Sequence, residues 1–195
     1  MIKEELEEDK VMNGITVLLI VVLAIVFICV CWYISTSNRI KRLDIKVSEA
    51  LSGIDVALTK RYDVLTKMVD IVKSYKEYEH QTFTDVIGLR MGMSMKERND
   101  ASAKLDSLAS ELRLVAENYP VLKSSENFAM LQRSVMDVEE HLQASRRLYN
   151  ANVTAYNNMI VTFPSSIVAN GMGAVSKQFF EAESYKRQDV SMTNL

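Results

Sequence analysis

The sequence predicts an all-α protein, in which an N-terminal transmembrane helix precedes an extended, antiparallel helical bundle with long, coiled-coil-like helices. Three observations predict this class. From Ile15 to Ile34, 19 of 20 residues are hydrophobic, and only Thr16 is not. The 195 residues include two prolines and six glycines, too few for the frequent turns of an all-β protein. Beyond the apolar segment, apolar residues recur at spacings of three and four, which is the period of a helix.

The apolar segment, residues 14–34, is long enough to cross a bilayer. About 21 residues at ~1.5 Å each span ~31 Å, the thickness of the hydrocarbon core. A cleaved signal peptide is the alternative, but it would begin with basic residues and have a shorter apolar run. Residues 1–13 instead form an acidic tail. We therefore expect an uncleaved, single-pass anchor, with the lipid bilayer as a partner.

Flanking charges predict the orientation of this anchor in the cell membrane. Basic residues are more numerous after the segment than before it: Arg39, Lys41, Arg42 and Lys46 against Lys3 and Lys10. Because basic flanks tend to remain inside, we expect the N-terminus outside and the body in the cytoplasm. The formal net charge of -2 implies no large basic face, so no nucleic-acid partner is expected.

The body, residues 38–185, reads as a series of helices. The first is predicted from residue 40 to about residue 88, with a turn at 92–100 and a second helix ending before Pro120. Ser124 or Ser125 is expected to cap a third helix, which Pro164 stops. A shorter, weaker helix, broken by Gly171-Met-Gly173, is predicted over 165–185, and residues 186–195 form a tail predicted to be disordered.

The third helix carries a seam of about five heptads from Phe128 to Phe163. Polar residues lie on or beside this seam: Tyr149, Asn150, Asn152, Tyr156 and Asn157. Arg146 and Arg147 stand next to it, and the first helix offers acidic residues that could pair with them: Asp55, Asp63 and Asp70. A solvated charged face is the alternative interpretation. Our hypothesis is that these residues form an interhelix or oligomer network that sets helix alignment, as buried polar residues do in coiled coils.

Two stretches of the body resemble the signatures of the LemA family. The first is Ile54-Asp-Val-Ala-Leu-Thr-Lys-Arg-Tyr-Asp63, followed by Val69, Val72-Lys73, Tyr75 and Glu79. The second includes Asn118-Tyr-Pro-Val-Leu-Lys123, Asn127-Phe128, Leu131-Gln132, Ser145-Arg-Arg-Leu-Tyr-Asn150, Tyr156-Asn157 and Phe163-Pro164. Thr66 departs from the pattern, because the family often has proline there. The resemblance implies a single-pass bacterial membrane protein with a helical-bundle domain and no established biochemical activity.

The sequence carries no pattern that predicts catalysis, a cofactor or a metal. His80 and His141 stand alone, and no glycine-rich phosphate loop is present. The predicted hairpin tip contains Met91, Met93 and Met95, with Gly88 and Gly92 beside them. Alternate methionines can hold Cu(I), but without a nearby Cys or His we favour an oligomer or partner contact. The two glycines either permit close packing or simply loosen the helix end.

The sequence therefore favours a structural, non-enzymatic protein. A first helix of ~75 Å beside a second of ~30 Å predicts an incompletely covered apolar face, and hence self-assembly into a ring- or cage-like homo-oligomer that acts as a scaffold. An adaptor that binds another membrane protein, such as a protease or sensor, is one alternative. A membrane-remodelling coat is another, but residues 39–46 are too few for the basic amphipathic helix it needs.

Overall fold

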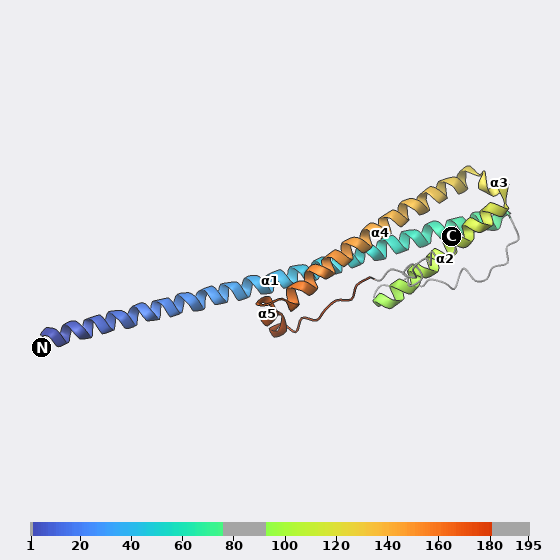
Figure 1. Cartoon of the computed structure of the whole chain (residues 1–195). Coiled ribbons are helices and arrows are strands. Elements are labelled where there is room, and N and C mark those ends of the chain that lie inside the picture. Colours follow the sequence, from blue (N-terminus) through green and yellow to red (C-terminus); the bar gives the residue numbers. More distant parts are fainter. Residues whose placement is uncertain (1, 76–92, 181–195) are drawn as a thin grey trace, which may run out of the picture. The chain divides into compact units, whose positions relative to one another are not determined.

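The computed structural model describes residues 2–75 and 93–180. Its helices are α1 (Ile2–Tyr75), α2 (Met95–Asn118), α3 (Pro120–Lys123), α4 (Glu126–Val161) and α5 (Ser165–Gly171), shown in Figure 1. Of these residues, 89% are helical and none is in a strand, which confirms the all-α class. The described residues form two compact units. One contains residues 2–44 and 156–176, and the other contains 45–75, 93–155 and 177–180.

The first unit contains the apolar segment of α1. Every side chain from residue 13 to residue 35 is exposed, and this is the only stretch of the described helices long and apolar enough to cross a membrane. Directly after this stretch α1 acquires a buried side, which begins at Thr36 and Ile40. In the same unit Ile160 of α4 and Val168 and Ala169 of α5 are also buried. An apolar helix that is exposed throughout its length is compatible with a membrane anchor.

The second unit is a helical bundle whose core consists of stripes at helical spacing. In α1 the stripe is Val47, Ala50, Ile54, Ala57, Leu58, Leu65, Met68, Val69 and Val72. In α2 it is Ala101, Leu105, Leu108, Leu112 and Ala116, and in α4 it is Phe128, Leu131, Leu142, Tyr149 and Val153. The stripe of α1 includes the adjacent pairs Ala57–Leu58 and Met68–Val69, so it is wide enough to face more than one neighbour.

Contacts between the helices fix their directions. Asp55, Arg61 and Leu65 of α1 meet Arg98, Asp106 and Ala109 of α2 in that order, so these two helices run parallel. On α4, by contrast, Asn152 reaches Lys46 and Glu139 reaches Arg61, so α4 is antiparallel to α1. The sequence left the direction of the second helix open, and only these contacts decide it.

Because α2 begins beside Asp55, the bundle has two sections. We call residues 55–75, α2 and residues 126–146 the three-helix section. The two-helix section consists of residues 45–54 and 147–155, with the extended residues 177–180 packed on α4. Gly53 and Ser145 mark the junction, since a Cβ added to Gly53 would lie 3.9 Å from the Ser145 Oγ.

Several boundaries differ from the sequence prediction. Helix α2 begins at Met95, inside the predicted turn, because Ser94 caps it. The short α3 was not predicted; it begins at Pro120, where a missing N–H costs nothing. Helix α4 ends at Val161, and the Phe163–Pro164 peptide is cis. The last predicted helix ends at Gly171, at the break expected there, and Gly173 takes a positive φ of 66°; unlike the prediction, the helix does not resume over residues 174–180.

The apolar stripe of α1 is better covered than the helix lengths suggested. Its residues from Val47 to Val72 are buried against α4 along the whole second unit and against α2 in the three-helix section. The prediction compared the first helix with the second and overlooked the third, which is 36 residues long. Incomplete cover of this stripe in the chain is therefore not an argument for self-association.

Candidate functional site

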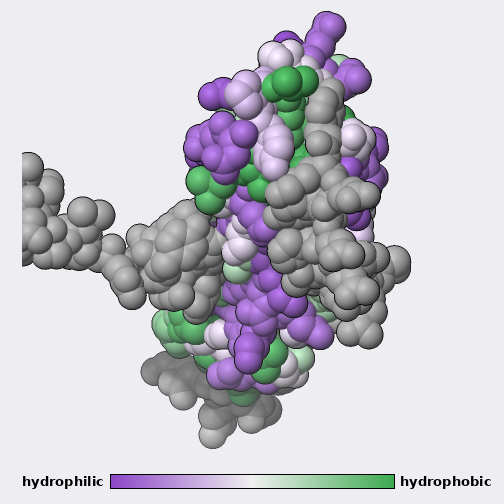
Figure 2. Space-filling view, turned by 90° about the vertical axis from the view of Figure 1, so that its right-hand side faces the viewer, coloured by the Kyte–Doolittle hydropathy of each residue, from purple (hydrophilic) through white to green (hydrophobic). Residues whose placement is uncertain are grey.

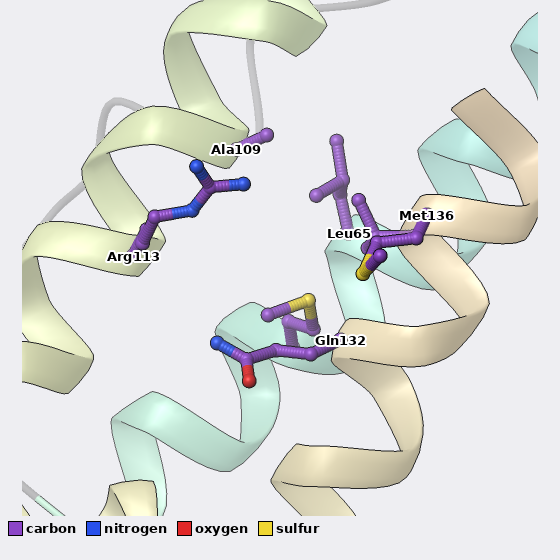
Figure 3. A pocket seen from close by; sticks show the side chains of 7 residues that line it. Leu65, Ala109, Arg113, Gln132 and Met136 are labelled. Atoms are coloured by element: carbon purple, nitrogen blue, oxygen red, sulfur yellow. The ribbon is translucent and has the colours of Figure 1, made fainter. Parts of the chain in front are cut away.

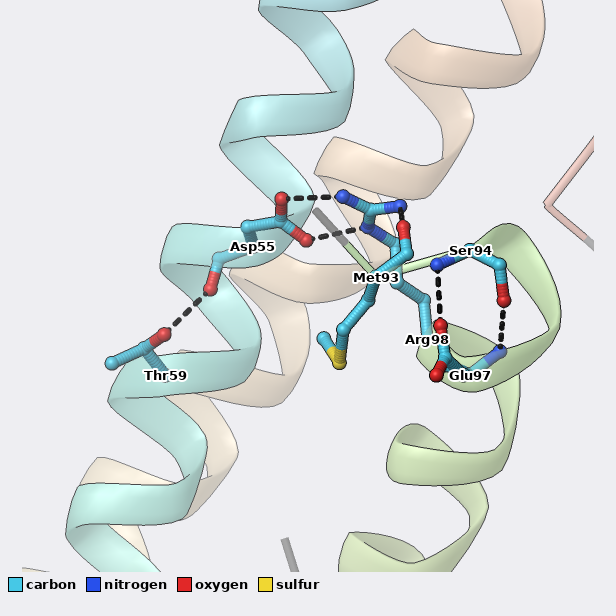
Figure 4. Close-up of polar contacts among 6 residues, drawn as sticks. All are labelled: Asp55, Thr59, Met93, Ser94, Glu97 and Arg98. Atoms are coloured by element: carbon cyan, nitrogen blue, oxygen red, sulfur yellow. Dashed lines mark hydrogen bonds and ion pairs between the residues drawn. The ribbon is translucent and has the colours of Figure 1, made fainter. Parts of the chain in front are cut away.

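The start of α2 is fastened to α1 by a bidentate ion pair. The Arg98 guanidinium donates from Nε and Nη2 to the two carboxylate oxygens of Asp55, at 2.6 and 2.8 Å, and from Nη1 to the Met93 carbonyl (Figure 4). These hydrogen bonds to Asp55 raise the pKa of Arg98 above its ordinary value, even though burial opposes them. Two parallel charged hydrogen bonds fix both the distance and the orientation of the two side chains. This pair therefore fixes the position of the start of α2 along α1.

A capping box stabilises the same end of α2. The Ser94 Oγ accepts from the Glu97 N–H at 3.2 Å, while a Glu97 carboxylate oxygen accepts from the Ser94 N–H at 2.7 Å (Figure 4). Both donors would otherwise be among the unpaired N–H groups of a helix start. The cap and the ion pair together hold the first turn of α2 against α1.

A second arginine joins all three helices. Arg61 of α1 is only 4% exposed, and its guanidinium contacts Asp106 of α2 and, at 2.9 Å, Glu139 of α4. Burying charges is costly, and removal of one partner leaves the others uncompensated. A buried ion network of this kind contributes little net stability, but it strongly disfavours any helix alignment in which the three charges do not meet.

Arg146 lies near this network on α4. Its guanidinium donates to the Ser102 hydroxyl of α2 and stands 4.8 Å above the centre of the Phe180 ring. Burial lowers the pKa of Arg146, and the neighbouring Glu139 carboxylate partly offsets that effect. Arg146 therefore connects the three-helix section to the residues that follow α5, through a hydrogen bond on one side and a cation–π contact on the other.

Tyr149 and Asn150 of α4 hold the extended segment 177–180. The Tyr149 hydroxyl donates to the Gln178 carbonyl at 2.8 Å, and burial raises the pKa of this hydroxyl. The Asn150 amide donates to the Phe180 carbonyl at 3.0 Å and accepts from the Phe180 N–H at 2.8 Å. Since the segment has no helix of its own, these side chains supply the partners that its backbone needs.

Asn152 contributes to the mating of α1 and α4, because its amide donates to the Lys46 carbonyl at 3.2 Å. The remaining predicted residues lie elsewhere. Tyr156 is buried and Asn157 half-buried in the first unit. Asp63, Asp70 and Arg147 are exposed on the bundle surface. Of the three acidic candidates only Asp55 meets an arginine, and that arginine is Arg98 of α2.

The predicted hairpin tip is described only in part. Met93 and Met95 are half-buried beside the start of α2, while Gly88, Met91 and Gly92 lie outside the described residues. Nothing in the described part of the chain brings three His, Cys, Asp or Glu side chains together as a metal site.

Sequence reasoning missed Arg61, Arg98, Ser102 and Asp106, although a signal for the two arginines was present. Arg61 falls between Leu58 and Leu65 on the apolar stripe of α1, at spacings of three and four. Arg98 stands three residues before Ala101 on the stripe of α2. A long charged residue in phase with a buried stripe predicts a buried ion pair, because an arginine placed there needs a partner.

A cavity of about 260 Å³ lies within the three-helix section, between α1, α2 and α4. Its walls are mostly apolar, with Leu65, Ala109 and Met136 among them. In Figure 3 the polar ends of Arg113 from α2 and Gln132 from α4 point into the space between the helices. The cavity is an opening between helices with two polar groups at its edge, and it contains no acid–base or nucleophilic pair among these residues.

Comparison with known proteins identifies the family. A model of the LemA family matches residues 50–193. The chain belongs to the LemA family. It is also 28% identical over 168 residues to the Protein LemA of Metamycoplasma hominis. The matched region covers 84% of this chain and 77% of that relative. The resemblance seen in the two signatures is thereby confirmed, and membership supports a membrane-associated protein.

The geometry explains what the LemA signatures do in this chain. Asp55 and Arg61, both in the first signature, hold α2 and α4 against α1. Arg146, Tyr149 and Asn150, all in the second, hold residues 177–180 against α4. These five signature residues thus hold helices together or hold residues 177–180 against α4.

Proposed function

We propose that this chain is a non-enzymatic scaffold, anchored in the cell membrane by residues 14–34, that self-assembles into a ring- or cage-like homo-oligomer. Its N-terminus lies outside and its body in the cytoplasm. The exposed apolar helix supports the anchor, and the basic residues Arg39, Lys41 and Arg42, all exposed, support the orientation.

One observation carries self-assembly: the two-helix section exposes large apolar side chains. Ile45 of α1 is 65% exposed and Leu148 of α4 is 58% exposed. Leu148 belongs to an outer row at helical spacing, Ala144, Leu148, Ala151 and Ala155, all exposed and uncharged. Small side chains on such a row let a neighbouring helix approach closely, and leucine supplies the buried area.

The construction of the section favours the same conclusion. Only α1 and α4 among the described helices form it, whereas the adjoining section has α2 as a third layer. Two helices alone leave outer surfaces uncovered, and on α4 that surface includes the uncharged row with Leu148. A second copy placed there supplies the missing layer, and anchoring in one membrane keeps the copies side by side. The hydropathy colouring of Figure 2 shows apolar patches among polar ones on the face displayed.

The test compares two exposed apolar residues of α4 in the full-length protein. Leu148→Gln is expected to shift crosslinked assemblies in native membranes toward monomer. Met130→Gln, at an equally exposed position in the three-helix section, is the matched control and should leave the assemblies intact. Imaging of the detergent-solubilised native protein then gives size and symmetry. Only monomers in the native protein would refute self-assembly.

An adaptor for another membrane protein is the second candidate, and the cavity between α1, α2 and α4 favours it. An apolar opening edged by Arg113 and Gln132 suits an apolar side chain with a nearby acceptor from a partner. Met136→Trp would fill that opening. Loss of one stoichiometric co-purifying membrane protein from Met136→Trp, with homo-oligomers unchanged, would establish the adaptor role.

A further inference from the structure

We propose that the turn joining α4 to α5 inserts apolar side chains into the surface of the same bilayer that holds the anchor. The partner is a phospholipid surface, and the inserting residues are Val161, Phe163, Ile167 and Val175. The inference rests on the anchoring of residues 14–34 proposed above, and it adds a second, peripheral contact with the membrane.

The first observation is the position of the turn within its unit. A Cβ added to Gly171 would lie 3.7 Å from the Tyr33 hydroxyl oxygen, and the Ser37 hydroxyl donates to the Met172 sulfur at 3.2 Å. The end of α5 is therefore packed against α1 at residues 33–37. This level of α1 is the boundary of the apolar segment, where the helix leaves the hydrocarbon core and aromatic residues favour the interface.

The second observation is the exposure of the turn. Phe163 is 77% exposed, Ile167 59% and Val175 70%, while Val168 and Ala169 on the opposite side of α5 are buried. α5 is thus packed on one side and presents apolar side chains on the other. In water such exposure is unfavourable for each large side chain, and burial in the interface of a membrane removes that cost.

The third observation is the charge pattern. No Asp, Glu, Lys or Arg occurs between Arg147 and Lys177, so the whole of residues 156–176 in this unit is uncharged. Three basic side chains of the unit, Arg39, Lys41 and Arg42, stand on α1 directly after the apolar segment, and all three are exposed. An uncharged apolar turn with basic residues nearby is the pattern of a peptide segment that lies in the interface, with the cations at the lipid phosphates.

The proposal can be tested by depth-dependent fluorescence quenching of the full-length protein in phosphatidylcholine–phosphatidylglycerol vesicles. Cys29 and Cys31 are first replaced by serine, and Phe163→Cys is labelled with an environment-sensitive fluorophore. We expect nitroxide groups placed shallowly on the lipid chains to remove most of the fluorescence, and aqueous iodide to have little effect. A label at Glu140→Cys, an exposed position on α4 in the other unit, should show the reverse.

A charge placed in the turn provides the matched perturbation. Ile167→Asp in the labelled protein should withdraw the turn from lipid, with loss of lipid quenching and a red shift. Asn170→Asp adds the same charge at an exposed polar position of α5 and should leave the signal unchanged. A label at Phe163→Cys that iodide quenches, and lipid nitroxides do not, would overturn the proposal. Protection from both quenchers would also overturn it, by showing that another protein copy covers the turn.

A separate label distinguishes failure of this inference from failure of the anchor. Leu23→Cys, near the middle of the apolar segment, should be quenched by nitroxides placed deep on the lipid chains. If Leu23→Cys is quenched and Phe163→Cys is not, the anchor stands and the second contact is wrong. If neither is quenched, the proposed anchoring itself is wrong.

Discussion

The three-helix and two-helix sections use different means to fix the same pair of helices, α1 and α4. In the three-helix section the mating is specified by charges: Arg61 is buried against Asp106 of α2 and Glu139 of α4, and Arg98 against Asp55 of α1. In the two-helix section it is specified by neutral groups: Asn152 bonds the α1 backbone, and Asn150 and Tyr149 hold an extended segment. A buried charge needs charged or polar partners, and for Arg61 the third helix supplies one of them, Asp106 of α2.

The largest effect is expected from Arg61→Ala in the three-helix section. Removal of the cation leaves Asp106 and Glu139 without their compensating charge, and a broken buried pair costs about 3–5 kcal/mol of unfolding free energy. Urea unfolding of the full-length protein in detergent, followed by circular dichroism, measures the change. Lys60→Ala, at the exposed neighbouring position, is the control and should change stability by less than about 0.5 kcal/mol. Equal stability of the two variants would show that the charges do not specify this section.

A smaller and more local effect is expected from Asn150→Ala in the two-helix section. The variant removes both hydrogen bonds to the Phe180 backbone, at an expected cost of about 2 kcal/mol to the docking of residues 177–180. Hydrogen exchange should show faster exchange of the Phe180 amide while the amides of α2 keep their protection. Asn158→Ala, an exposed asparagine of α4, is the matched control. Loss of protection in α2 as well would mean that the two sections are not independent.

Next in size is Ser94→Ala at the start of α2. It removes one half of the capping box, which typically costs about 1 kcal/mol. Exchange should accelerate in the first turn of α2 only, because the ion pair of Arg98 with Asp55 still holds the helix in place. Ser134→Ala, on the outer side of α4, should leave that turn unchanged. If the whole of α2 loses protection, the cap contributes more to the three-helix section than the ion pair does.

The smallest expected effect is a dependence on pH in the two-helix section. Because the folded pKa of Tyr149 is raised, the folded chain retains this proton after the unfolded chain begins to lose it, at pH about 10. The stability due to the Tyr149 hydroxyl is therefore fully present below pH 10 and falls as pH rises through the folded pKa. Tyr149→Phe should be less stable at neutral pH and should decline less steeply above pH 10. Identical slopes would show that the hydroxyl is not buried as described.

The sequence predicted the helices well where a single periodic signal governed them. The end of α2 at Asn118 and the end of α4 close to Pro164 follow from the helix-stopping chemistry of proline. Predictions failed where a local feature competed with the pattern. The break at Gly171–Gly173 was expected, but the helix predicted beyond it does not form over 174–180, where backbone partners come from Asn150 and Tyr149 instead.

Some residues that the sequence singled out make contacts between helices in the structure, although their pairings differ. Asp55, Arg146, Tyr149, Asn150 and Asn152 were singled out for interhelix contacts, and each has one in the structure or bonds residues packed on α4. Their partners were not predicted, because pairing depends on which helix end lies beside which. Whether these residues also act between copies of the chain stays a prediction, tested by the size of the assemblies.

The sequence by itself determined the class of this protein: an apolar segment long enough for a bilayer, followed by striped helices with the residues of the LemA signatures. These properties are local, since periodicity, caps and segment length depend only on neighbours along the chain. The tertiary structure alone decided that α2 runs parallel to α1, that Asp55 meets Arg98, and that α5 ends beside Tyr33. Such facts are set by the packing of residues far apart in sequence. The energetic effect of a buried charge or an exposed apolar side chain depends on the groups that surround it.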